Sequence, residues 1–483
     1  MRVRSLDEVT ASGDLRWFAH GIERLHSGSG NGPPFLDPRE PIMLARAPGR
    51  LDVMGGIADY SGSLVLEMPL ACATFAAAQR QEARQIDVSS IRAGRAHTFT
   101  IDIDLILRGE RSSPAALAGH FAEHPDQRWA SYITGSVYRC LTLAGVRSPA
   151  HGIRLLITSD VPEGKGVSSS AALEVAVMSA AAATFGLEMD GIALATACQW
   201  AENHIASAPC GIMDQMTSAL GRHDRLLRLR CQPAAVEGHI TIPAGYRFYG
   251  IDSGIRHAVT GADYGMVRTA AFMGYRMIAD WAGVPTSIDD GFVTVRDDRW
   301  GGYLANIEPE EFAARFADRL PARMQGSEFL ARYGGITDIV TRVDASRWYP
   351  VRAATSHPVY EHGRVTRFAR MLETVADEAT AVAMGNLMFE SHGSYSLCGL
   401  GSDGTDRLVS LVADADPATT GVYGGKITGG GSGGTVAILG TESASAAVHG
   451  IARQYERETG QSAYVFDGSG PGAEEIGVLS FRA

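Results

Sequence analysis

A turn rich in glycine and serine connects a strand pattern to a long helix pattern in the middle of this chain. Residues 153–158, IRLLIT, are apolar and predict a strand, and the turn PEGKGVSSSAA occupies 162–172. An alanine-rich stretch from about 169 to 185 then predicts a helix, and a second helix is expected over 190–205. Strand and helix patterns also mix along the rest of the chain, so we predict an α+β fold.

The same turn has the composition of an anion site. Gly164 and Gly166 let backbone N–H groups approach a ligand, and the start of a helix adds unpaired donors and a positive dipole end. Ser168, Ser169 and Ser170 add hydroxyl groups, one of which is able to reach Mg²⁺. The order of residues fits neither the common P-loop nor G-x-G-x-x-G. A plain strand-to-helix turn with serine caps is the alternative.

A second glycine-rich segment, GGKITGGGSGG, covers 424–434 and holds seven glycines in eleven positions. Such a run is usually a flexible linker. Here the strand pattern TVAIL follows at once, at 435–439, and helix patterns lie on both sides. We therefore predict a tight loop packed against another loop or a ligand, since glycine allows the closest backbone approach.

Charged residues stand in apolar surroundings in two further segments. Residues 45–62, ARAPGRLDVMGGIADYSG, place Arg50, Asp52 and Asp59 among turn glycines, which suits either a polar ligand or a solvated surface turn. Residues 209–216, PCGIMDQM, place Asp214 after a predicted helix that carries Glu202. A buried carboxylate needs a partner, and Arg50 is the natural partner for Asp214. The alternative is that Asp214 caps a helix.

Composition excludes several classes of protein. The 483 residues carry 43 Lys and Arg against 54 Asp and Glu, a net charge of −11, which disfavours nucleic acid and anionic membrane surfaces as partners. The six cysteines form no C-x-x-C pair and indicate free thiols in a reducing compartment. No apolar run reaches the roughly 18 residues of a membrane span. We expect a soluble, cytoplasmic protein without a signal peptide.

The length predicts more than one domain. The first forty residues are weakly patterned, with turn formers at 27–34, and we expect them to be an N-terminal extension. The pattern restarts after residue 240, which predicts domains over 41–240 and 241–483. Smaller expectations are a strand at 42–46 entering a turn at Pro48–Gly49, hairpin strands over 86–103, and a solvated loop at 288–300.

Taken in order, the four segments resemble the motifs of the GHMP kinases, which include galactokinase and the homoserine and mevalonate kinases. Residues 47–62 are similar to the galactokinase signature APGRVNLIGEHTDYNGG, and 162–172 are similar to the second motif, Pro-x-x-x-Gly-Leu-x-Ser-Ser-Ala. Residues 424–434 resemble the third, glycine-rich motif, and PCGIMDQMT resembles the sequence around the galactokinase catalytic aspartate. The resemblance extends from about Ala45 to Leu439. The segment 285–345 has no counterpart in short members and is expected to be an insertion.

The resemblance implies a two-domain fold with the active site in the cleft between the domains, and a reaction that uses ATP and Mg²⁺. It implies that Asp214 lies beside the sugar hydroxyl and that Arg50 pairs with it. The resemblance further assigns residues to binding roles, with the Mg²⁺ serine fixed only to within one position: Asp59, Tyr60, Gly211 and Tyr264 for the sugar; Gly164, Gly166, Ser168, Ser169, Ser170 and Ala171 for ATP phosphates; Ser170 and Glu202 for Mg²⁺.

Two sets of residues also have purely structural interpretations. Trp129 and Tyr132 match residues that flank the adenine in galactokinases, but they also suit core packing on an amphipathic helix. His357 and His362 are interpreted as structural, because five-residue spacing does not put them on one helix face.

One departure from the signature concerns the substrate. The Glu-His pair of galactokinases is replaced by Gly56 and Ile57, and in galactokinases that glutamate lies near the C6 hydroxyl of the sugar. L-Arabinopyranose has the ring stereochemistry of galactose without C6. GGIADYSG and the segments 252–265 and 390–409 also resemble plant L-arabinokinases. The resemblance thus implies a kinase acting on C1 of L-arabinose. The alternatives are D-galactose as substrate, or a sugar sensor without turnover.

Overall fold

The computed structural model describes residues 3–5, 13–27, 35–37, 39–92, 95–110, 112–255, 262–289 and 292–482. Helices and strands alternate along these ranges, which confirms the predicted α+β class. No helix in the described ranges is long and apolar enough to cross a membrane. Most of the predicted loop at 27–34, and residues 256–261 of the segment 252–265, lie outside the described residues.

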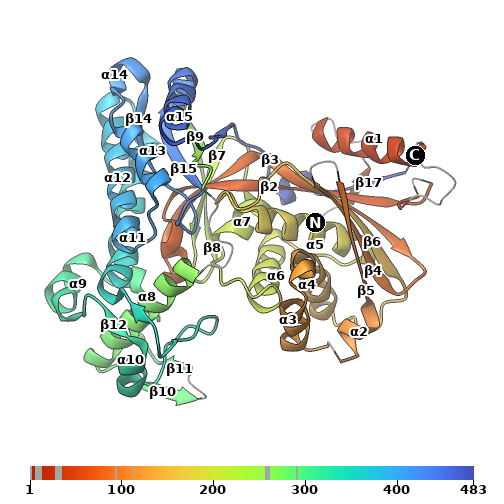
Figure 1. Cartoon of the computed structure of the whole chain (residues 1–483), viewed down its shortest axis with the longest axis horizontal. Helices are drawn as coiled ribbons and strands as arrows, with labels where there is room; N and C mark the ends of the chain where they lie inside the picture. The colour runs from red at the N-terminus through yellow and green to blue at the C-terminus, as the bar shows by residue number, and fades with distance from the viewer. Residues whose placement is uncertain are drawn as a thin grey trace.

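The first sheet has nine strands, seven of them in the order β1-β17-β2-β3-β6-β4-β5. Strand β7 pairs with the beginning of β3, and β8 pairs with β7. Alternate residues of its strands face opposite layers, as the two-residue period of a strand requires. Ala76 and Ala78 of β3 pack with helices α4 to α7, whereas Phe75 and Ala77 pack with α1 on the other face (Figure 1). The bounds are β1 Val3–Ser5, β2 Ile42–Met54, β3 Leu64–Gln81, β4 Gln85–Arg92, β5 Arg95–Asp102, β6 Gly152–Ser159, β7 Arg225–Arg230, β8 Ala235–Thr241, β17 Val478–Phe481, α1 Gly13–Ser27, α4 Arg128–Leu143, α5 Ser169–Phe185, α6 Gly191–His204 and α7 Met213–Leu220.

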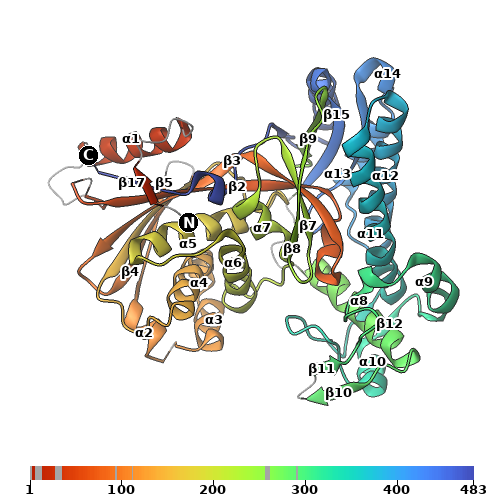
Figure 2. The ribbon, with the colours of Figure 1, turned by 180° about the vertical axis from the view of Figure 1, so that it is seen from behind.

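The second sheet has four strands in the order β14-β15-β9-β16. Helices α11 and α12 cover one face, where Phe248 and Leu439 are buried, and α13 and α15 cover the other, where Tyr249 and Ile438 are buried (Figure 2). The bounds are β9 Tyr246–Asp252, β14 Val422–Ile427, β15 Thr435–Thr441, β16 Val465–Asp467, α11 Val351–Thr374, α12 Glu378–Leu397, α13 Asp403–Ala413 and α15 Ser445–Thr459.

The segment after β9 builds a further apolar core between α8 and α11. Its aromatic residues include Phe312, Phe316 and Phe329, and Ile57 and Tyr60 of the short helix η2 enter the same core. The segment therefore packs directly on the signature turn of the first sheet. The bounds are η2 Gly56–Ser61, α8 Ala262–Trp281, β10 Thr286–Asp289, β11 Phe292–Val295, η4 Leu304–Asn306, α9 Pro309–Arg315, β12 Met324–Gln325, α10 Gly326–Tyr333 and β13 Trp348–Tyr349.

Several local predictions are confirmed and two are wrong. The hairpin expected over 86–103 is formed by β4 and β5, which pair antiparallel. The strand expected at 42–46 instead runs to Met54, because Pro48–Gly49 is a bulge inside β2 rather than a turn. The segment 288–300, expected to be a solvated loop, instead holds the end of β10 and the whole of β11, which pair as an antiparallel hairpin. The aspartates of this segment predicted a loop, although here they flank and end hairpin strands.

The last strand of the chain, β17, returns to the first sheet. Strand β17 lies between β1 and β2, although the sequence division assigns 241–483 to a second domain. Helix α1 likewise packs its apolar face on β2 and β3 and belongs to the same layer structure. The first forty residues are therefore not a detached extension where they are described. The boundary near residue 240 itself stays a prediction.

Candidate active site

The turn between β6 and α5 adopts an unusual backbone. Gly164, Gly166 and Ser168 have φ of 72°, 71° and 58°, in the left-handed region. Ser168 occupies the cap position of α5, yet its side chain makes no cap hydrogen bond, and its Oγ is buried without a partner among the described residues. The alternative of a serine-capped turn is therefore wrong for Ser168. A helix start without a side-chain cap leaves backbone donors for an anion.

The glycine-rich segment 424–434 lies against this turn, as predicted for a packed loop. Thr435 Oγ1 donates a hydrogen bond to the Lys165 carbonyl at 2.8 Å. A Cβ on Gly434 would lie 2.8 Å from the same carbonyl oxygen, and Gly434 has φ of 80°. Glycine is needed there both for the conformation and for the close approach. Lys165 also forms an ion pair with Asp252 at the end of β9.

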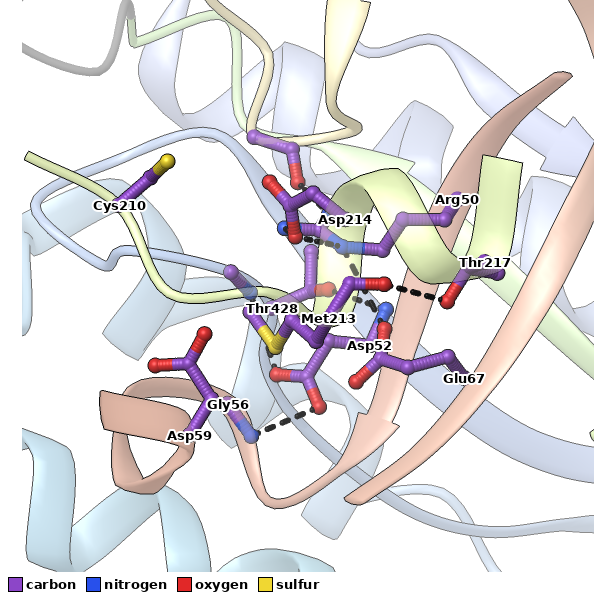
Figure 3. A network of polar contacts seen from close by, with 12 residues as sticks. Arg50, Asp52, Gly56, Asp59, Glu67, Cys210, Met213, Asp214, Thr217 and Thr428 are labelled. Carbon is purple, nitrogen blue, oxygen red and sulfur yellow. Dashed lines mark hydrogen bonds and ion pairs between the residues drawn. The ribbon is translucent and has the colours of Figure 1, made fainter. Parts of the chain in front are cut away.

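Arg50 and Asp214 form a close pair beside the turn, as the sequence predicts (Figure 3). Arg50 Nε and Nη2 lie 2.8 Å and 2.7 Å from Asp214 Oδ1, and Nη1 donates to the Gly166 carbonyl at 2.7 Å. Arg50 is buried, and Asp214 stands in the first turn of α7 after the cap residue Ile212. Asp214 is therefore not the cap residue of α7, and its carboxylate pairs with Arg50 instead.

A second carboxylate lies behind Arg50. Glu67 of β3 is fully buried, its Oε2 is 3.4 Å from Arg50 Nε, and neither of its oxygens has a hydrogen-bond partner among the described residues. Burial, followed by repulsion from Asp52, raises the pKa of Glu67 well above its usual range. Burial disfavours the charge on Arg50, yet Asp214 and then Glu67 hold the pKa of Arg50 above its ordinary value. The sequence analysis missed Glu67 because it stands in an ordinary strand pattern.

Asp52 joins the signature segment to the third motif. Its Oδ2 lies 2.6 Å from Lys426 Nζ, and both side chains are fully buried. The Gly56 and Gly429 backbone N–H groups donate to Asp52, and the Asp52 N–H donates to Thr428 Oγ1. The alternative of a solvated surface turn is therefore wrong. Lys426 is a further residue that the sequence analysis did not single out.

The residues predicted to bind the sugar lie together near Asp214. Asp59 is buried, and a Cβ on Gly211 would overlap its carboxylate, so Gly211 is the residue that fits there. Asp59 Oδ1 accepts a hydrogen bond from the Tyr60 N–H at 2.6 Å. Burial, then repulsion from Asp214, raises the pKa of Asp59 to about 7. The Tyr264 ring lies 5.8 Å from the Tyr60 ring, edge to face, while Tyr60 itself packs in the core.

The residues predicted for Mg²⁺ also lie together. Burial, then repulsion from Asp214, raises the pKa of Glu202 to about 7, and a hydrogen bond from Ser170 opposes that rise. Gln215 Nε2 donates to Glu202 Oε2 at 2.5 Å and to Glu174 Oε2 at 3.2 Å. Glu174, which the sequence analysis missed, is fully buried, and its Oε1 has no hydrogen-bond partner among the described residues.

Ser170, Glu202 and Glu174 together offer hydroxyl and carboxylate oxygens to a divalent cation. Hydroxyl and carboxylate oxygens are the ligands that Mg²⁺ takes, and it usually binds through one or two carboxylates plus phosphates. Glu174 adds a carboxyl oxygen, Oε1, that is buried without a hydrogen-bond partner among the described residues. Burial, then repulsion from Glu202, raises the pKa of Glu174 well above its usual range, and a bound cation would offset that repulsion. The residues therefore fit Mg²⁺. The described ranges contain no group of three or more His, Cys, Asp or Glu side chains arranged to hold a metal by themselves.

Trp129 lies in the first turn of helix α4. It packs edge to face on Phe99, and the Arg92 guanidinium lies 5.3 Å from its ring centre. Arg92 also pairs with Glu163 of the phosphate-side turn at 2.8 Å. The ring is half-buried, so both the adenine-flanking and the core-packing interpretations stay open.

The two histidines set aside as structural make separate contacts. His357 Nδ1 lies 2.8 Å from Ser394 Oγ, and the Leu64 N–H donates to His362 Nδ1 at 3.1 Å.

Comparison with known proteins identifies the family. The GHMP kinases N terminal domain matches residues 131–222, and the galactokinase galactose-binding signature matches residues 35–80. The galactokinase of Chloroflexus aggregans is 30% identical over 88% of this chain and 90% of its own length. The chain belongs to the galactokinase branch of the GHMP kinase family. The L-arabinokinase of Arabidopsis thaliana is 44% identical over 92% of this chain, which spans about half (47%) of that relative's length.

Solved structures agree on the fold of this GHMP kinase. The crystal structure of Lactococcus lactis galactokinase complexed with galactose has a TM-score of 0.69, with 19% identity, and covers 97% of this chain and 100% of its own. Streptococcus pneumoniae phosphomevalonate kinase has a TM-score of 0.52 over 88% of this chain. At these identities the comparison establishes the fold, which is the two-domain GHMP kinase fold expected from the motifs.

Proposed function

We propose that this GHMP kinase transfers the γ-phosphoryl group of ATP to the C1 hydroxyl of L-arabinose, giving L-arabinose 1-phosphate. The observation that carries the proposal is the Arg50–Asp214 pair, which stands between the uncapped start of α5 and the Asp59–Gly211 contact. One side of the pair suits phosphates and the other suits sugar hydroxyls. The 44% identity to a plant L-arabinokinase supports this substrate.

Phosphoryl transfer depends on positioning and charge stabilisation more than on covalent chemistry. The turn over 162–172, with Gly164, Gly166 and the serines, would hold the ATP phosphates through backbone and hydroxyl donors. Ser170 and Glu202 would hold Mg²⁺, with Glu174 behind them, and the ion would neutralise phosphate charge. Arg50, kept cationic by Asp214 and Glu67, would stabilise charge that develops on the transferring group.

Asp214 would accept or orient the proton of the attacking hydroxyl. A general base has to lie within hydrogen-bond reach of that proton, and the Asp214 side chain, which is 22% exposed, has one carboxylate oxygen, Oδ1, engaged by Arg50. Asp59, Tyr264 and the Gly211 backbone would bind ring hydroxyls. Tyr60, whose hydroxyl is buried without a partner among the described residues, would support Tyr264 from the core.

The space beside Gly56 supports a pentose over a hexose. A Cβ on Gly56 would overlap Tyr395 Oη, and that hydroxyl accepts from the Ile57 N–H at 2.8 Å and donates to the Gly429 carbonyl at 3.0 Å. A glutamate, as in the galactokinase signature, has no room there. The acid expected to bind the C6 hydroxyl is thus replaced by a tyrosine from α12 that is already engaged.

D-Galactose is the second candidate substrate. Two observations favour it: the match of residues 35–80 to the galactose-binding signature, and the fold shared with a galactokinase complexed with galactose. A sensor without turnover is disfavoured, since the serine motif, Arg50 and Asp214 are all present.

The test is ADP release from ATP and Mg²⁺ in a coupled assay with L-arabinose, D-galactose, D-galacturonate and D-xylose. We expect the highest kcat/KM with L-arabinose. Asp214→Ala should lower kcat by about 10³-fold, because it removes the group that orients the attacking hydroxyl. Circular dichroism and thermal unfolding should show that the fold survives. Near-normal turnover by Asp214→Ala would reject its role, and D-galactose as the better substrate would reject the argument from Gly56.

The domain division and the location are proposed on other grounds. We propose that 41–240 and 241–483 act as the two functional halves, with 285–345 as an insertion, apart from the return of β17 to the first sheet. A cytoplasmic location is supported by six cysteines that are all free thiols.

A further inference from the structure

A buried ion pair connects the insertion to helix α8. Arg268 Nε and Nη2 donate to the two oxygens of Asp338 at 2.7 Å and 2.8 Å, and the two residues are 6% and 4% exposed. Asp338 also accepts hydrogen bonds from the Val340 and Thr341 N–H groups and from Thr341 Oγ1. Such two-pronged pairing fixes the plane of the guanidinium as well as its position.

The third nitrogen of this guanidinium reaches the sugar side of the site. Arg268 Nη1 donates to the Cys210 carbonyl at 2.9 Å. The Cys210 N–H in turn donates to Asn203 Oδ1 at 2.8 Å, so the Cys210 residue is held by α6 on one side and by α8 on the other. Cys210 directly precedes Gly211, whose Cα faces the Asp59 carboxylate, and Asp214 follows three residues later.

A buried ion pair is a weak stabiliser, because removing two charges from water offsets much of their attraction. The presence of the Arg268–Asp338 pair at this place is better explained by the orientation it gives to the Arg268 guanidinium. Arg268 donates an N–H group to the Cys210 carbonyl, directly before the close contact between Gly211 and Asp59. A Cβ at position 211 would overlap the Asp59 carboxylate, so the loop has no room to move toward Asp59. A shift of about 1 Å in a group that orients a substrate costs on the order of a hundredfold in rate.

We propose that Asp338 and Arg268 are positioning residues, through which the insertion holds the 209–212 loop in register with Asp59 for sugar binding. The inference rests on the proposed function, since it assigns the insertion to the sugar side of that site. It gives the segment 285–345 a specific role: without its Asp338, the guanidinium of Arg268 loses the partner that aims it at Cys210.

The experiment compares Asp338→Asn with Asp297→Asn, a matched control in the same insertion. Asp297 accepts a hydrogen bond from Tyr275 of α8, as Asp338 does from Arg268, but among the described residues no hydrogen bond connects Tyr275 to the 209–212 loop. We expect Asp338→Asn to raise the KM for L-arabinose about tenfold or more, with the KM for ATP changed less than about twofold. Asp297→Asn should change neither. Arg268→Lys should resemble Asp338→Asn, because lysine lacks the fork that binds both partners.

Hydrogen–deuterium exchange of the 209–217 peptide separates this inference from the proposed function. We expect faster exchange in Asp338→Asn than in the wild type and in Asp297→Asn, whether or not any sugar is phosphorylated. If the wild type phosphorylates no sugar but the exchange result holds, the function is wrong and the positioning stands. If both Asn variants change exchange equally, or if Asp338→Asn raises both KM values alike, the positioning role is rejected. Should Asp338→Asn not fold, Arg268→Lys decides by the same readouts.

Discussion

The proposed phosphate side and the proposed sugar side of this site are built in different ways. The phosphate side consists mainly of backbone: two glycine-rich loops, 162–172 and 424–434, whose close packing depends on Gly434. The sugar side consists of buried side chains from distant segments, with Asp59 from η2, Arg268 from α8 and Asp338 from the insertion. A backbone site tolerates different side chains around it, whereas a side-chain site depends on each partner. The difference predicts separate effects of mutations on ATP and on sugar.

Gly211→Ala should have the largest selective effect, on the sugar side. The added methyl group would overlap the Asp59 carboxylate, and nothing in that buried site can move away cheaply. We expect the KM for sugar to rise by about a hundredfold while the KM for ATP changes little. Steady-state kinetics with each substrate varied would measure this. Gly119→Ala, at a helical position with no atom within 4 Å of the new Cβ, is the control. A parallel rise in both KM values would contradict the separation of the two sides.

Gly434→Ala should act on the phosphate side with a smaller effect. The new Cβ would lie 2.8 Å from the Lys165 carbonyl at a φ of 80°, so the two loops have to separate slightly. We expect the KM for ATP to rise about tenfold, because a misplaced backbone loop loses part of its phosphate contacts. Nucleotide affinity measured by calorimetry without sugar would check the result. Unchanged ATP affinity together with weakened sugar binding would reverse the comparison.

Asp59→Asn should change the pH dependence of stability. Burial, then Asp214, raises the pKa of Asp59 to about 7, so the native state keeps a proton that the unfolded chain has lost above about pH 4. The stabilisation is complete below pH 4 and is lost as the pH rises through 7. The variant should therefore gain up to about 2 kcal/mol relative to the wild type between pH 5 and 7.5. Urea unfolding at both pH values would measure the gain, and a pH-independent difference would argue against the raised pKa.

Sequence reasoning reached the phosphate side more completely than the sugar side, for a physical reason. Glycine and serine spacing determines a local backbone path, so the turn before α5 and the packed loop at 424–434 are both readable from neighbouring residues. The pairing of Arg50 with Asp214 was also predicted, because a buried carboxylate requires a cation. The family motifs added the remaining candidates.

Other site residues have no local signal. Glu67 and Glu174 stand in apolar strand and helix patterns, and their importance appears only once Arg50 and Glu202 are beside them. Lys426 and Tyr395 act through contacts with Asp52 and Gly56, more than 330 positions away in the sequence. Asp338 lies in the segment 285–345, for which the sequence left open whether it covers the sugar site or forms an interface. Tertiary packing creates these contacts, and a single sequence does not contain the distances that would predict them.

The Asp52–Lys426 pair also has a consequence for the order of synthesis. The two residues are 374 positions apart, so Asp52 is made long before its partner leaves the ribosome. Until then the carboxylate has no cation to offset its burial, and the signature turn around Gly56 has to stay hydrated. Translation at about 5–20 residues per second makes that delay roughly 20 to 75 seconds. We therefore expect the signature turn of a nascent chain to close only after the third glycine-rich loop has been made.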